Sequence, residues 1–551
     1  MRKILIPLAL LLVAGSFGIA QEAEDTYDPA DYRRIPLLRL PEGFGGEDDY
    51  LDLHFGLGGG FIKQLFYIDG VARMDYNVGP FTLTAELAAS NDQKYAPARV
   101  MNASGNLGWI YFLLQEGGVV YDWKWLNLQA GRYRLYDIVD SPYSLYINSM
   151  GIASNTMQIK VESPRFIYSS RWIELNSRSA VSSPEWDLYH QYAEQGFLGK
   201  DPNLPLDSAD PTSTFNDNLS PNSIGFPDRG VNYKIYALKY RDWRFGILDA
   251  TVYTERSFDY EYFLNPLPQY FIQYVKGTPG RPWTTDSNEN DLLGFFWDIK
   301  KQNRWEAYAQ FLMDDFGLGF VAKNFSDNPW KAAWAVGGRV HTPYGRFGFH
   351  HGGALKYTFE PITSPQSGRY NGNIARTAYG YTYYPETRYN DDEDDGSAVS
   401  ILIEDNMVGY KHGENNIAFL VDYQNTFSGF KLNAELEFVL AGNNSPANPW
   451  QDYTHRSEMG DGSRLLDDST LEKRLELRLN LSHRRGPWLF YAAAAIGGRF
   501  NRLELQEAVN IAGTKPEEWS TADQIYIWKG TQEHELIFRF SLGFRYTVPV
   551  L

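Results

Sequence analysis

No cysteine occurs anywhere in the 551 residues of this sequence. The chain therefore forms no disulfide, and a zinc site built on thiolates is excluded. A chain of this length without cross-links has to be held by a large core or by closure of its backbone on itself.

Long hydrophobic runs are also missing after the first twenty residues, and none approaches the roughly 18 residues of a membrane helix. The mean hydropathy is −0.42, yet 16% of the residues are aromatic. This combination is typical of a transmembrane β-barrel, whose alternating strands hide their hydrophobicity and whose interfaces need aromatic girdles. An exported soluble β-sandwich or a surface hydrolase is the alternative. The net charge of −17 argues against a nucleic-acid partner.

The first twenty residues have the pattern of a secretory signal peptide. Arg2 and Lys3 precede an apolar run, and the small residues Gly18 and Ala20 stand before a cut ahead of Gln21. No cysteine follows, so the signal is not that of a lipoprotein. Residues 21–48 are charged and interrupted by proline, which predicts a periplasmic extension. Residues 49–551 are left for the barrel, in the outer membrane of a Gram-negative-type bacterium.

The last strand shows the alternation most clearly, in "HELIFRFSLGFRYTVPVL" (534–551). Every second residue is apolar, and Arg539 and Arg545 stand on the other face, which is the period of a strand between two solvents. We expect the rings to face lipid and the two arginines to face the lumen. The apolar positions are Leu536, Phe538, Phe540, Leu542, Phe544, Tyr546 and Val548.

The same strand resembles the signal that the barrel-assembly machinery reads. Ser541, Gly543, Tyr546 and Val548 follow its polar-x-Gly-x-x-aromatic-x-hydrophobic pattern, although the chain ends on Pro-Val-Leu and not on Phe. The resemblance implies that this machinery is a partner of the chain.

Short and long connections alternate along the chain, as in outer-membrane barrels with short periplasmic turns and long extracellular loops. Eight tight turns with both termini in the periplasm predict eighteen antiparallel strands, or sixteen if the "ESPRF" turn is discounted. The turns lie at 76–81, 121–125, 162–166, 241–245, 301–305, 342–347, 425–430 and 484–488, and the long loops at 90–105, 176–230, 256–290, 354–410, 441–470 and 501–532.

Signatures of catalysis and of metal binding are weak. "DDEDDG" (391–396) has the opening rhythm of a calcium loop, but position 402 is Leu and not the closing Glu, so a solvated acidic loop is favoured. Gly56, Gly58 and Gly60 of "HFGLGGGF" (54–61) share one strand face and favour bending of the wall or close packing against it. The adjacent histidines of "FHHGG" (349–353) should point to opposite faces. No serine is marked as a nucleophile, so we predict a non-enzymatic protein without cofactor or metal, with a hydrolase as the alternative.

The middle of the chain resembles the Wzi-type capsule assembly proteins, which are outer-membrane barrels. The resemblance lies in "FLNP" (263–266), "NEND" (288–291) and "LMDD" (312–315), which occur in the family's order, and in the upstream segment 130–159. It implies an eighteen-stranded barrel that binds and organises surface polysaccharide and has no catalytic residues. The rival with the same fold is a porin or substrate-selective channel, because loops 176–230 and 354–410 are long enough to stand outside or to fold inward.

The candidate binding residues are those of the matching motifs: Asn265, Asn288, Asp291, Asp314 and Asp315. Neighbours in a strand point to opposite faces, so one of Asp314 and Asp315 should face the lumen. We hypothesise that this acidic pair pins loop 256–290 into a cap over the pore. The alternative is that the two acids only solvate the rim.

Overall fold

The computed structural model describes most of the chain. The described residues are 49–62, 65–92, 104–107, 109–175, 229–254, 256–276, 289–301, 304–314, 330–359, 380–384, 388–390, 398–400, 402–444, 464–507 and 526–550. The expected signal peptide, the expected extension 21–48 and the acidic loop 391–396 lie outside them.

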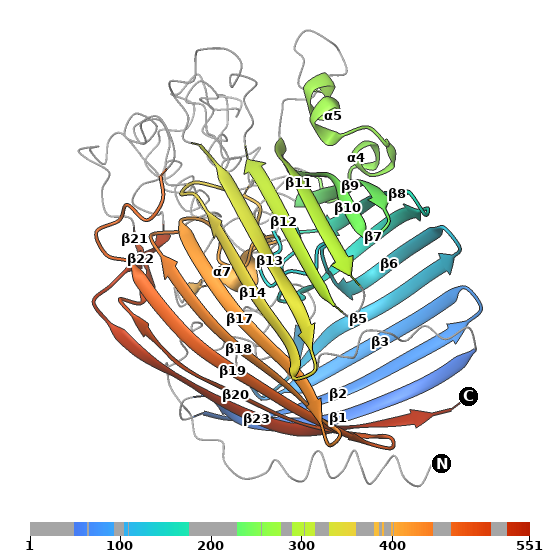
Figure 1. Ribbon diagram of the computed structural model, residues 1–551, viewed down its shortest axis with the longest axis vertical. Coiled ribbons are helices and arrows are strands. Elements are labelled where there is room, and N and C mark those ends of the chain that lie inside the picture. The colour runs from blue at the N-terminus through green and yellow to red at the C-terminus, as the bar shows by residue number, and fades with distance from the viewer. Residues whose placement is uncertain are drawn as a thin grey trace, which may run out of the picture.

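Eighteen antiparallel strands form one closed barrel, as predicted (Figure 1). The last strand pairs with the first from Asp52↔Pro549 to Ile62↔Arg539, so the wall has no free edge. A short strand, β4 (Ser104–Leu107), adds to β5 as a hairpin. The wall strands are β1 (Tyr50–Ile62), β2 (Leu65–Val78), β3 (Phe81–Ser90), β5 (Ile110–Trp123), β6 (Leu126–Arg134), β7 (Ala153–Glu162), β8 (Phe166–Glu174), β9 (Arg229–Tyr240), β10 (Trp243–Thr254), β11 (Glu289–Lys301), β12 (Trp305–Asp314), β13 (Ala332–Thr342), β14 (Gly345–Ala354), β17 (Asn416–Phe427), β18 (Phe430–Ala441), β19 (Glu472–Arg485), β20 (Trp488–Phe500) and β23 (His534–Pro549).

All eight predicted turns join neighbouring strands of the wall. The turn "ESPRF", which decides between sixteen and eighteen strands, connects β7 to β8. Within it the Ser163 N–H donates to the carbonyl oxygen of Phe166 at 2.8 Å. The count of eighteen is therefore confirmed. Gly79, Gly429 and Gly486 hold φ angles of 54°, 82° and 57° in three of these turns, which is a conformation that favours glycine.

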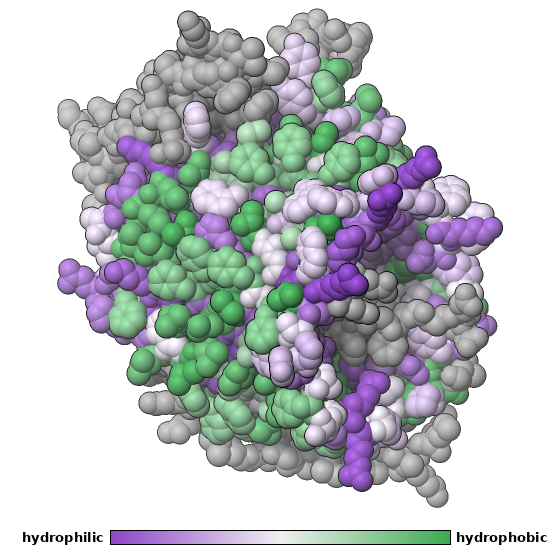
Figure 2. Space-filling model, viewed as in Figure 1, coloured by the Kyte–Doolittle hydropathy of each residue, from purple (hydrophilic) through white to green (hydrophobic). Residues whose placement is uncertain are grey.

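The outer face of the wall is apolar over long stretches. On β20 the exposed side chains run from Trp488 through Phe490 and Ile496 to Phe500. On β23 Leu536, Phe538 and Leu542 are exposed, as the alternation predicts for a face toward lipid. Figure 2 shows apolar side chains gathered in a broad field over the strands that Figure 1 draws at the left.

Gly58 and Gly60 lie on the inner face of β1, beneath tyrosine rings. A Cβ built on Gly58 would stand 2.5 Å from the hydroxyl oxygen of Tyr491, and one on Gly60 would stand 2.7 Å from that of Tyr67. Gly543 on the neighbouring strand also lies under Tyr491. The close packing that we expected is therefore made by rings of the wall.

Helices and small sheets occur only in the connections among the described residues. They are α4 (Tyr260–Leu264), α5 (Gln269–Lys276), α7 (Ile403–Asn406), the pair β15 (Arg388–Asn390) and β16 (Ala398–Ser400), and the pair β21 (Leu503–Glu507) and β22 (Tyr526–Gly530). None of the described helices is long and apolar enough to cross a membrane.

Candidate functional site

A segment between β6 and β7, residues 135–152, crosses the lumen. The hydroxyl of Tyr143 in this segment donates to Glu437 of β18 at 3.1 Å. β18 stands ten strands from β6 around the ring of eighteen, so the two strands lie on opposite sides of the barrel. Tyr143 and its neighbours Leu145 and Tyr146 are fully buried. These residues lie in the segment 130–159 of the family resemblance and are not among the long loops expected from the sequence.

Asp137 ties the crossing segment to two strands of the wall. Its carboxylate accepts from the Tyr233 hydroxyl of β9 at 2.6 Å and from Gln310 Nε2 of β12 at 2.9 Å. Tyr146 stacks on Tyr233 with ring centroids 5.4 Å apart. Burial raises the pKa of the Asp137 carboxyl above its usual value, although the hydrogen bonds from Tyr233 and Gln310 favour the charged form.

A second set of segments enters the lumen from the connection between β14 and β17. These are residues 355–359, 380–384 and 402–415, and together with 135–152 we call them the plug. Asn148 joins the two parts, because its backbone N–H donates to Val408 at 2.6 Å and its side chain donates to the carbonyl oxygens of Glu404 and Met407. From the wall, Arg229 of β9 donates to the carbonyl oxygens of Gly380 and Tyr383.

Charged groups anchor the plug to β18 and β19. The buried carboxylate of Glu437 is 2.8 Å from Lys411 Nζ and 3.1 Å from His412 Nε2, both of the plug. From the wall, Arg478 Nη1 lies 2.9 Å from the same carboxylate. A buried carboxylate with several charged partners fixes the segment in one place, since removal of any partner leaves charge uncompensated.

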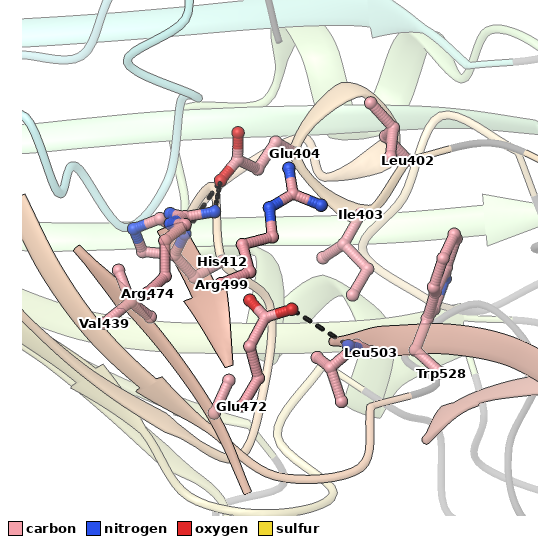
Figure 3. Close-up of a pocket in the computed structure, with 11 residues that line it drawn as sticks. Leu402, Ile403, Glu404, His412, Val439, Glu472, Arg474, Arg499, Leu503 and Trp528 are labelled. Atoms are coloured by element: carbon pink, nitrogen blue, oxygen red, sulfur yellow. Dashed lines mark hydrogen bonds and ion pairs between the residues drawn. The ribbon is translucent and has the colours of Figure 1, made fainter. Parts of the chain in front are cut away.

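A cavity lies beside this anchor (Figure 3), at the ends of β18, β19 and β20 that join the long loops. Its volume is about 50 Å³, a few times the roughly 10–15 Å³ that one water needs. The lining residues come from the plug, the wall strands β18 to β20 and the hairpin β21–β22. They are Leu402, Ile403, Glu404, His412, Val439, Ala441, Glu472, Arg474, Arg499, Leu503 and Trp528.

The polar groups of the cavity are held by defined contacts, which Figure 3 shows. Arg474 Nη1 donates to Glu404 Oε1 at 2.9 Å, and its Nη2 donates to His412 Nδ1 at 3.2 Å. Glu472 accepts from the backbone N–H of Leu503 at 2.9 Å. The indole N–H of Trp528 has no acceptor among the described residues. The cavity therefore offers carboxylates and guanidinium groups beside apolar walls and the ring of Trp528, which suits a ligand rich in hydroxyl groups.

The structure does not bring the predicted binding residues together. Asn265 ends α4, and its carbonyl oxygen accepts from Lys234 Nζ at 2.5 Å. Asp291 lies four residues before the exposed Phe295 on β11, so both side chains are on the outer face. The Asp291 carboxylate accepts a hydrogen bond from Thr251 Oγ1. Asn288 and Asp315 lie outside the described residues.

Asp314 faces inward and holds a segment other than the predicted one. Its Oδ2 accepts from the backbone N–H of Phe359 in the plug at 2.9 Å, and its Oδ1 accepts from Asn290 at 3.3 Å. The expected cap is wrong for residues 256–276, because this stretch lies against the outer face of the wall. Whether the loop caps the pore or covers the outside depends on which face of β10 and β11 it crosses. A motif match does not indicate that face.

Arg539 and Arg545 lie on the buried face of β23, opposite its exposed rings. Arg539 Nη1 is 3.7 Å from Glu476 Oε1 of β19. The guanidinium nitrogens of Arg545 have no hydrogen-bond partner among the residues that the structure describes. The paired histidines of β14 separate as predicted: His350 points inward to Tyr308 and Asp422, and His351 stacks outside on Phe419.

Some cavity residues carried a signal in the sequence and others did not. Arg474 and Arg499 stand on the polar faces of alternating strands, which marks them as inward-facing. Glu404, His412 and Trp528 lie in connections without periodicity, and only folding brings them to these strands.

Comparison with known proteins gives similarity at the level of whole-chain structure. No protein family matches the sequence, and no curated protein is similar to it. Wzi, an outer-membrane protein involved in group 1 capsule assembly in Escherichia coli and a carbohydrate-binding β-barrel, aligns with a TM-score of 0.45 and 9% identity over 90% of this chain and 84% of its own. OccD3 (OpdP) of Pseudomonas aeruginosa aligns with a TM-score of 0.40 and 9% identity over 91% of both chains. OprD of Pseudomonas aeruginosa aligns with a TM-score of 0.39 and 8% identity over 92% of this chain and 96% of its own. The chain itself, closed and with an apolar outer belt, has the architecture of an outer-membrane β-barrel.

Proposed function

We propose that this barrel binds a surface polysaccharide at its extracellular mouth and does so without catalysis and without conducting solutes. The observation that carries the proposal is the plug, which crosses from β6 to β18 and is fixed by buried hydrogen bonds and ion pairs. A segment held at both walls by buried polar groups is costly to displace, which supports a closed barrel over an open channel.

The cavity above the plug supports the binding part of the proposal. Sugars present hydroxyl groups in many directions, and Glu404, Glu472, Arg474 and Arg499 offer both acceptors and donors. The ring of Trp528 adds an aromatic surface to the cavity wall. This arrangement suits the edge of one sugar unit of a chain that continues outside the barrel.

Binding of labelled polysaccharides to the purified barrel tests the site. The probes are an acidic polyuronate and a neutral dextran, each titrated against the parent and two variants, Trp528→Leu and Arg499→Gln. We expect the preferred probe to bind each variant about tenfold more weakly, which corresponds to one lost hydrogen bond for Arg499→Gln and to lost ring contact for Trp528→Leu. Trp243→Leu, at a turn on the far end of the barrel, is the matched control. Equal affinities for parent and variants would refute the site.

Conductance in planar bilayers separates the proposal from the channel that shares its fold. The proposal predicts no steady unitary current from the parent barrel. Large and persistent unitary currents would favour a porin or a substrate-selective channel, whatever the binding assay gives.

A further inference from the structure

The outer wall of the barrel is polar in one region where the neighbouring wall is apolar. On β8 to β11 one outward-facing row consists of Tyr168, Tyr236, Ile247 and Phe295, which are paired with one another across the strands. The next outward row toward the long loops consists of Ser170, Lys234, Asp249 and Leu293, and the row after it of Trp172, Asn232, Thr251 and Asp291. Charged and amide groups therefore replace the apolar belt over two rows.

The apolar stretch that remains on these strands is too short for a membrane. On β10 it runs from Trp243 to Ile247, four residue steps or about 13 Å along the strand, which tilt reduces to about 10 Å. On β20 it runs from Trp488 to Phe500, twelve steps or about 40 Å along the strand and about 30 Å across the membrane. Only the second value reaches the roughly 25 Å of a barrel's apolar band.

Residues 256–276, which include α4 and α5, cover the polar rows from outside; we call them the strap. Lys234 Nζ donates to the carbonyl oxygens of Asn265 and Leu267, and Ser170 Oγ donates to that of Phe263. Gln269 donates through its backbone and its side chain to Asp249. Figure 1 draws the two helices at the upper right, beside the ends of β8 to β11. The strap thus satisfies the polar groups of the wall.

The surface that the strap turns away from the wall is apolar. Tyr262, Phe263 and Ile272 pack inward, whereas Tyr260, Leu264, Leu267, Phe271, Tyr274 and Val275 are 52% to 71% exposed. The Tyr236 hydroxyl, in the last apolar row of the wall, donates to the carbonyl oxygen of Pro266 at 2.9 Å, so the exposed Leu267 of the strap begins where that belt stops. An exposed apolar surface of this size is uncommon in contact with water.

We propose that the strap is a lipid-contacting element that completes the apolar belt over β8 to β11 and binds acyl chains of the outer leaflet. We choose lipid as the partner of this surface because the exposed face of the strap continues an apolar belt that already faces lipid. The strap does so beside the two rows of the wall that are polar. The proposal is independent of polysaccharide binding and needs only that the barrel is in a membrane.

Site-directed spin labelling tests this directly, because the chain has no cysteine of its own. Nitroxides are placed singly by Phe271→Cys and Tyr274→Cys on the strap, by Phe245→Cys on the belt and by Arg485→Cys at a turn. All four side chains are exposed, so the substitutions leave the packing intact. The barrels are reconstituted in phosphatidylcholine vesicles, and collision with oxygen is compared with collision with a water-soluble nickel chelate.

We expect the oxygen-to-nickel ratio at Phe271→Cys and Tyr274→Cys to match that at Phe245→Cys and to exceed that at Arg485→Cys several-fold. A ratio equal to that at Arg485→Cys would place the strap in water and overturn the proposal. Exclusion of both reagents together with dipolar broadening between labels would overturn it in favour of contact with a second copy of the chain.

Discussion

Asp314, the last residue of β12, accepts a hydrogen bond of 2.9 Å from the backbone N–H of Phe359 in the plug. Phe359 has a φ angle of 76°, which a bulky residue rarely adopts without support from its surroundings. Both residues are buried. This contact, together with the hydrogen bonds between Thr358 and Ala332 of β13, therefore holds a strained part of the plug to the wall.

Asp314→Ala should loosen the plug, because it leaves the buried N–H of Phe359 without its acceptor, at a cost of about 1–3 kcal/mol. In planar bilayers we expect brief openings that the parent lacks. Asp314→Asn is the control, since its amide oxygen can still accept from Phe359, and it should stay closed. The role of Asp314 is wrong if the alanine variant is as silent as the parent and unfolds at the same urea concentration.

Asp137→Asn should change how stability depends on pH. Burial raises the pKa of Asp137 in the folded state, whereas the same carboxyl in the unfolded chain has a pKa of about 4. Between these two pKa values the folded state therefore binds more protons than the unfolded state. The parent should therefore lose stability as the pH rises from about 4 through the folded pKa. The variant lacks this titration, and its advantage over the parent should grow over that interval.

Urea unfolding in detergent micelles, followed by tryptophan fluorescence at several pH values, measures this difference. Ser149→Ala, elsewhere in the same segment, should run parallel to the parent. Parallel curves for the parent and Asp137→Asn would contradict the assignment.

The wall of the barrel was predictable because its signal is local. A period of two with charge on one face identifies a strand, and eight aromatic turns fix the number of strands. The contacts of the plug were not predictable, because Tyr143 and Glu437 are 294 residues apart and the sequence around one carries no signal for the other. Its hydrogen bonds join segments whose own sequences have no periodicity.

The strap left a trace in the sequence that the alternation alone did not explain. On β10 the usual pattern inverts, with apolar Leu248 inside and Asp249 outside. The inversion has a physical cause, since the plug makes the inner side dry and the strap makes the outer side polar. A strand whose apolar residues change from the outer face to the inner face midway therefore indicates that other segments cover both faces.

The strap should loosen in acid, because Asp259 holds its two ends together through Arg256 and Lys276. Asp259 caps α4 and lies 2.8 Å from Arg256 Nε and 2.7 Å from Lys276 Nζ. Burial alone would raise the pKa of Asp259, but Lys276 and Arg256 outweigh it and lower the pKa. The resulting stabilisation is present above the unfolded value of about 4 and is lost as the pH falls through the lowered folded pKa.

A nitroxide at Phe271→Cys should therefore become more mobile when the pH falls below about 4. Asp259→Asn keeps an oxygen for the N-cap but loses both ion pairs, so its label should already be more mobile at pH 7 and should change less in acid. A parent label whose mobility stays constant from pH 7 to pH 3 would exclude this role of Asp259.

Arg545 and Arg539 should respond in opposite ways to removal of their charge. Both lie on the buried face of β23, and Arg545 is 1% exposed without a hydrogen-bond partner among the described residues. A buried charge without hydrogen bonds costs stability, so Arg545→Met should leave the urea midpoint unchanged or raise it. Arg539→Met removes a partner of the fully buried Glu476 and should lower the free energy of unfolding by about 1–3 kcal/mol. Urea titration of the two variants and the parent measures these changes in stability. If Arg545→Met destabilises the barrel as much as Arg539→Met does, Arg545 has a partner in the lumen that its described neighbours do not supply.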